Sequence, residues 1–180
     1  MATWIALLRG INVLGRRIVP MNVLSTSLER DGLQRVRTYI QSGNVIFQCA
    51  RGTPGSLARR IGGIVLDAHG FEPSVVVLSV AELVRAAADN PFPAAAAAPQ
   101  TLHLYFLEAE PRAPDLEALK RARSAREAFH LRGKVFYLHT PQGFAASKLR
   151  NDVERRLGVQ ATARNWRTVN KLIDLAGRSG

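Results

Sequence analysis

Residues 33–49 read LQRVRTYIQSGNVIFQC, a stretch that predicts two strands joined by a tight turn. In residues 33–40, apolar or β-branched side chains alternate with charged or aromatic ones, which is the two-residue period of a strand. Residues 41–44, QSGN, are typical of a turn because Gly and Asn tolerate positive φ. The apolar residues 45–49 then form the returning strand of a hairpin.

Helical patterns flank this hairpin on both sides. Upstream, an apolar strand over 3–8 precedes a helix that begins at Pro20, a residue favoured at the first helical position. Downstream, an amphipathic helix over 57–68 precedes a strand over 73–79. The order is therefore βαββαβ, which is the split βαβ or ferredoxin-like unit.

The same order recurs in the second half of the chain. Its elements are a strand over 101–108, a helix over 114–125, hairpin strands over 128–131 and 134–139, a helix marked by Leu149, Val153 and Leu157, a strand over 160–163 and a helix over 166–176. The sequence therefore predicts an α+β fold of duplicated ferredoxin-like (split βαβ) units, with two antiparallel sheets and packed helices. The predicted domains are unit 1 over 1–89 with an extra helix at 80–88, a Pro/Ala-rich linker over 90–100, and unit 2 over 101–180 with a C-terminal helix.

Two predicted strands, 4–8 and 102–107, are apolar on both faces. The helices of a ferredoxin-like unit cover only one face of its sheet. We therefore expect the second faces to be covered by the partner unit or by the extra helices.

Composition narrows the class of protein. The chain of 180 residues carries a formal net charge of +11, from 25 basic and 14 acidic residues. Most basic residues are arginine and alanine runs accompany them, which suggests a coding bias, and the charge is spread over both halves. A single cysteine excludes an internal disulfide and a thiolate zinc site, and no metal or cofactor is predicted. Without a signal-like or membrane-spanning segment, a cytoplasmic location is expected.

Three strings carry a family resemblance. They are ALLRGINV over 6–13, VRTYIQSGNVIF over 36–47 and TARNWRTV over 162–169. With NPF at 90–92 and SKL at 147–149, they make the chain resemble the bacterial domain-of-unknown-function (DUF) family 1697 over essentially its whole length. The resemblance implies the duplicated ferredoxin-like fold, and it implies no established activity, cofactor or catalytic set.

The segment between the last strand and the last helix is the first candidate site. Asn165 is a plausible N-cap, and Arg164 and Arg167 flank a helix start that is already positive. A bound phosphate or carboxylate would compensate this charge, with Thr168 beside it. A carboxylate from the same chain, or exposure to water, would do so equally well. Trp166 shares the apolar stripe of the helix and is read as a core residue.

The loop over 9–17 is the second candidate, with Arg9 and Asn12 as anion contacts. Its two glycines have the spacing of a P-loop, but Arg16 and Arg17 replace Lys-Ser/Thr and no helix begins there, so nucleotide hydrolysis is unsupported. A flexible loop with solvated arginines is the alternative. The family that this chain resembles usually has a Gly-Gly pair after Ile-Asn-Val. In this chain Leu14 occupies the first of these two positions, which bears on whether the loop backbone can approach a ligand closely.

The hairpin turn supplies further polar groups, namely Gln41, Ser42 and Asn44, with Arg37 on the preceding strand. We expect this turn at the sheet end opposite the loop over 9–17. We expect the turn and the segment 164–168 each at the hairpin end of its own unit, which favours these two as a pair.

These observations leave three hypotheses for function. The leading one is binding of an anionic small ligand, bearing phosphate or carboxylate, through arginines at a helix N-terminus. The second is a nucleic-acid-associated protein, with which the spread positive charge is compatible without indicating it. The third is an enzyme of unknown reaction whose base is His103, His139 or Asp31, although no catalytic constellation is recognisable.

Overall fold

The computed structural model describes residues 1–178, which form two compact units. Unit 1 comprises Met1–Arg85 together with the chain from Lys171 on, and unit 2 comprises Ala86–Asn170. The chain passes from one unit to the other within α3 (Val80–Ala88) and again within α6 (Trp166–Gly177). Residues 179–180, which close the predicted second unit, lie outside the described residues.

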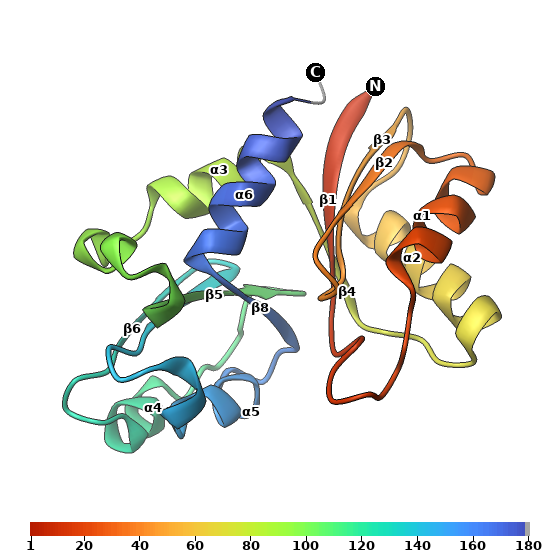
Figure 1. The fold of residues 1–180 in the computed structure, drawn as a ribbon. Coiled ribbons are helices and arrows are strands. Elements are labelled where there is room, and N and C mark those ends of the chain that lie inside the picture. Colours follow the sequence, from red (N-terminus) through yellow and green to blue (C-terminus); the bar gives the residue numbers. More distant parts are fainter. Residues whose placement is uncertain (179–180) are drawn as a thin grey trace. The chain divides into compact units, whose positions relative to one another are not determined.

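Unit 1 contains a four-stranded antiparallel sheet and two helices packed on it, in addition to its parts of α3 and α6. Its elements are β1 (Ala2–Leu8), α1 (Met21–Arg30), β2 (Gln34–Tyr39), β3 (Asn44–Cys49), α2 (Pro54–His69) and β4 (Val75–Ser79). The sheet order is β2-β3-β1-β4. Helices α1 and α2 lie side by side on one face of this sheet (Figure 1).

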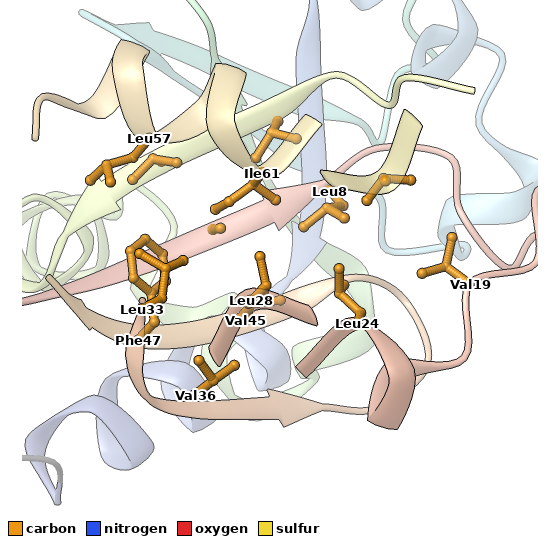
Figure 2. Packing of buried hydrophobic residues seen from close by; sticks show 14 of the residues in the cluster. Leu8, Val19, Leu24, Leu28, Leu33, Val36, Val45, Phe47, Leu57 and Ile61 are labelled. Atoms are coloured by element: carbon orange, nitrogen blue, oxygen red, sulfur yellow. The ribbon is translucent and has the colours of Figure 1, made fainter. Parts of the chain in front are cut away.

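The core of unit 1 fills the space between this sheet and its helices. Figure 2 shows Leu24 and Leu28 of α1 and Leu57 and Ile61 of α2 converging on strand residues such as Phe47. All of these side chains are at most 2% exposed. The apolar periodicity of the sequence therefore corresponds to the buried face of each element.

The ends of α1 and α2 follow from local chemistry. Helix α2 begins with a capping box between Thr53 and Ser56 and ends at Gly70, whose φ of 75° closes the helix in the left-handed conformation. Pro20 was expected as the first residue of α1, but it is the N-cap, with an extended ψ of 121°. Proline suits either position because it has no N–H to satisfy.

Unit 2 repeats the arrangement of unit 1. Its elements are β5 (Leu102–Leu107), α4 (Leu116–Ala122), β6 (Ala128–Arg132), β7 (Val135–His139), α5 (Val153–Leu157) and β8 (Ala161–Asn165), in the sheet order β6-β7-β5-β8. The three pairs of neighbouring strands in each sheet run antiparallel, so the predicted α+β fold with two antiparallel sheets is confirmed. The duplicated split βαβ pattern is compatible with this arrangement.

Two segments of unit 2 differ in local structure from what the sequence predicts: one is less regular and the other more regular. The segment expected as one helix from Leu149 to Leu157 is a 3₁₀ turn, η4 (Leu149–Asn151), followed by the short α5. The side chains of Leu149, Val153 and Leu157, on which that prediction was based, are nevertheless buried. The Pro/Ala-rich segment 90–100 holds two further 3₁₀ turns, η1 (Pro93–Ala97) and η2 (Pro99–Thr101).

Both faces of the central strands are buried, as their apolar patterns predict. Ile5 and Leu7 project from β1 on the face away from α1 and α2, and neither is exposed. Leu104 and Phe106 of β5 are likewise at most 1% exposed on the face away from the core of unit 2.

Candidate functional site

The loop after β1 and the β2–β3 turn lie together at one end of the unit 1 sheet. The Asn12 amide nitrogen donates hydrogen bonds to the carbonyl oxygens of Gln41, at 2.7 Å, and Val19, at 2.9 Å. Its amide oxygen accepts from the Val19 N–H at 2.8 Å. The expectation that loop and turn lie at opposite ends is therefore wrong. Because β1 and β3 are antiparallel neighbours, the end of one lies beside the start of the other, with Leu7 opposite Asn44.

The polar groups of the turn support its own conformation. Asn44 is completely buried, and its amide nitrogen donates to the Tyr39 carbonyl at 3.0 Å and to the Ser42 hydroxyl at 2.9 Å. Gly43 has a φ of 78°, and a Cβ there would lie 2.8 Å from Cβ of Leu8. This glycine is therefore required both by its conformation and by the closeness of β1.

The loop itself is an ordered hairpin with an apolar tip. A β-bridge joins Val13 to Arg16, and Leu14 between them is 95% exposed with a φ of 49°. The Arg17 guanidinium lies 5.5 Å from the centre of the Phe71 ring, which is cation–π geometry. Arg9 and Arg37, the remaining candidates of unit 1, are both exposed.

The candidate segment of unit 2 belongs partly to a strand. Arg164 and Asn165 were expected in a loop, but they are the last residues of β8, because its pairing with β5 continues to Asn165 opposite His103. The Asn165 side-chain oxygen accepts from the Thr168 N–H at 2.9 Å, which confirms it as the N-cap of α6. Arg167 is exposed and Trp166 is only half-buried.

Arg164 has a buried guanidinium. The residue is 9% exposed, and its Nη1 donates to the Ala163 carbonyl at 2.8 Å. Burial lowers the pKa of Arg164 to about 10, so the group keeps its charge at neutral pH.

This segment lies at the sheet end opposite the β6–β7 hairpin. Asn165 pairs at the start of β5, whereas the hairpin begins beside Phe106, at the end of that strand. The prediction that the segment 164–168 lies at the hairpin end of unit 2 is therefore wrong. Among the sequence candidates, the structure brings Asn12 to Gln41 within unit 1 and joins Asn165 to Thr168 within unit 2.

Unit 2 also has a hollow that was not predicted from the sequence. Its volume is about 310 Å³, and its walls are the connection from α4 to β6 and the loop that follows β7. Arg123, Arg126 and Lys148 are exposed around it. Glu127 and Ser147 are buried in its lining. The three arginines within 121–126 could have indicated the basic first wall. The sequence gives no sign that they lie close to the residues near 148.

Hydrogen bonds shape the first wall of this hollow. The Glu127 carboxylate accepts from the Ser124 N–H at 2.8 Å, and Arg123 donates to the Glu127 carbonyl oxygen at 2.6 Å. In the second wall, the Ser147 N–H donates to the Phe144 carbonyl at 3.2 Å. The Ser147 hydroxyl is buried and has no hydrogen-bond partner in the described part of the chain.

The three residues considered as general bases make structural contacts elsewhere. His103 stacks on Phe144 with ring centres 3.8 Å apart, and burial lowers its pKa to about 4. His139 lies against Phe92, with 5.7 Å between the ring centres, and Asp31 forms an ion pair with Arg60. None of the three lines the hollow.

Within residues 1–178, no three His, Cys, Asp or Glu side chains gather closely enough to hold a metal ion. No helix in that range has the length and apolar character to cross a bilayer.

Comparisons with known proteins give a family and a fold. The family model described as "Protein of unknown function (DUF1697)" matches residues 1–137. A solved structure, described as that of a conserved bacterial protein from Streptococcus pneumoniae, is similar with a TM-score of 0.68 and 20% sequence identity, over 97% of this chain and 98% of that one. At this identity the likeness concerns the fold alone. Among curated proteins, none matches the sequence.

Proposed function

The chain belongs to the DUF1697 family of proteins of unknown function, and we propose that it binds a small ligand bearing a phosphate or carboxylate group. The observation that carries this proposal is the hollow of unit 2, where Arg123, Arg126 and Lys148 surround a small concave space. One acidic side chain, Glu127, opposes these three cations. An anion would find its charge complement there.

The side chains of the hollow suit an oxyanion. A guanidinium presents parallel N–H groups that match phosphate or carboxylate oxygens, while a lysine ammonium acts as a mobile point charge. Neither Arg126 nor Lys148 forms an ion pair with any acid of the described chain. Their charge is therefore available to a ligand.

The size of the hollow favours a small molecule. Ligand pockets span roughly 300–1,000 Å³, and this hollow, at about 310 Å³, lies at the lower limit. It accommodates a metabolite of modest size rather than a polymer segment.

The start of α6 is a weaker location for the anion than the sequence suggested. Asn165 already accepts the Thr168 N–H, so one of the free N–H groups of that helix start is satisfied within the chain. Arg164 is buried and hydrogen-bonded, which leaves Arg167 as the exposed cation of the segment.

Thermal unfolding with inorganic phosphate tests the proposal. Phosphate, compared with sodium chloride at equal ionic strength, is expected to raise the melting temperature of the wild-type chain because it binds the folded state. The double variant Arg126→Ala/Lys148→Ala is expected to lose this rise. Arg121→Ala is the matched control, since Arg121 is exposed on α4 and does not line the hollow. Equal phosphate responses in all three proteins would refute the assignment.

A further inference from the structure

The Ser147 hydroxyl is the first observation that defines the ligand more closely. The residue is 5% exposed and belongs to the lining of the hollow, and its hydroxyl oxygen is buried with no hydrogen-bond partner among residues 1–178. Leaving a buried hydroxyl unpaired costs about 1–3 kcal/mol, and most buried polar side-chain atoms are paired. If the Ser147 side chain rotates toward the hollow, a ligand can supply the missing partner and remove this cost.

The Glu127 carboxylate is the second observation. It is 7% exposed and accepts one hydrogen bond from the Ser124 N–H. An ionised carboxylate has about four acceptor positions and no donor. The hollow therefore combines exposed cations with a buried acceptor and a buried hydroxyl that can both donate and accept.

A bare inorganic anion would use only part of this arrangement. It would be drawn to the cations Arg123, Arg126 and Lys148 and repelled by Glu127. The hollow has room for roughly ten water molecules at about 30 Å³ each, which is more than one phosphate ion needs.

We infer that the ligand of this hollow is a hydroxylated phosphate or carboxylate of small size. Its anionic group contacts Arg126 and Lys148, and its hydroxyl groups donate to the Glu127 carboxylate and pair with the Ser147 hydroxyl. This inference rests on the proposed function, and it adds that the hydroxyl groups, rather than the anion alone, determine selectivity.

Isothermal titration calorimetry with two matched probes tests the inference. The probes are sn-glycerol 3-phosphate and n-propyl phosphate, which have the same carbon chain and phosphate but differ in two hydroxyl groups. The wild-type chain is expected to bind the glycerol compound at least tenfold more tightly. A buried polar site discriminates strongly against a ligand that leaves its groups unpaired.

Two variants separate a ligand contact from a structural role. Ser147→Ala removes an unpaired hydroxyl and keeps the backbone bond to Phe144, so the chain is expected to fold and the tenfold preference to fall at least threefold. Glu127→Gln can still accept the Ser124 N–H, but it removes the negative charge. It is therefore expected to strengthen n-propyl phosphate binding and to weaken sn-glycerol 3-phosphate binding, two opposite shifts that a general loss of stability would not produce.

The possible results distinguish the two proposals. If both probes and inorganic phosphate bind the wild-type chain with equal affinity, the hydroxyl selectivity is refuted while the anion site stands. If none of them binds, the anion site fails and the selectivity fails with it. An unchanged preference in Ser147→Ala and Glu127→Gln would also overturn the inference.

Discussion

Replacing Leu14 by glycine is expected to stabilise this protein. Leu14 lies in the hairpin loop after β1 with a φ of 49°, in the left-handed region that disfavours side chains with a Cβ. Its side chain is 95% exposed, so its removal sacrifices almost no burial.

The magnitude follows from two opposing terms. Relieving a left-handed non-glycine residue contributes about 1–2 kcal/mol, and the greater freedom of glycine in the unfolded chain costs about 0.4–1 kcal/mol. Taken at the middle of these two ranges, the expected net gain for Leu14→Gly is about 0.8 kcal/mol in the free energy of unfolding. For a chain of this length that is a rise of about 1–4 °C in melting temperature.

Urea unfolding followed by circular dichroism measures this gain, and Leu66→Gly is the matched control. Leu66 is partly exposed, at 42%, and it lies within α2, where glycine costs about 1 kcal/mol. The same substitution is thus expected to have opposite signs at the two positions. A loss of stability in Leu14→Gly as large as in Leu66→Gly would refute the conformational reasoning.

Two further predictions concern His103 and Gly43. Burial lowers the pKa of His103 from 6.5 to about 4, so the unfolded chain binds more protons between these values, and stability rises with pH across that window. The free energy of unfolding should fall by about 3 kcal/mol between pH 7 and pH 4 because of this residue. Urea unfolding at both pH values should show a smaller fall in His103→Phe than in the wild-type chain. An equal fall in the two proteins would contradict the assignment. Gly43→Ala should destabilise by about 1–3 kcal/mol, because its Cβ would lie 2.8 Å from Cβ of Leu8 and its φ is 78°. Gly63 lies in α2 with open space around its Cβ position, so Gly63→Ala should stabilise the chain by up to about 1 kcal/mol. If urea unfolding shows that both alanine variants are destabilised, or that both are stabilised, this explanation is ruled out.

Much of the fold was predictable because the relevant signals are local. The alternation in residues 33–40 and the helical spacing in 57–68 depend only on neighbours within a few positions, and both predict the elements found there. The apolar character of both faces of β1 likewise predicted their burial. Element ends were less predictable, as β8 shows, because strand pairing with β5 decided where it stops.

The candidate site was predicted less well, since a site depends on which segments meet. Asn12 and Gln41 were both identified from the sequence, but they were assigned to opposite sheet ends although they are hydrogen-bonded. Arg164 was predicted to contact an anion at the start of α6, and only the complete structure shows that the residue is buried.

Periodicity and turn chemistry thus determined the order of strands and helices, because each depends on a short run of residues. Tertiary structure alone decided which ends of strands adjoin and which side chains are buried. It also brought residues 123–127 and 147–148 to the walls of one hollow. These are properties of chain segments far apart in sequence, and they arise only when antiparallel pairing and packing bring those segments together.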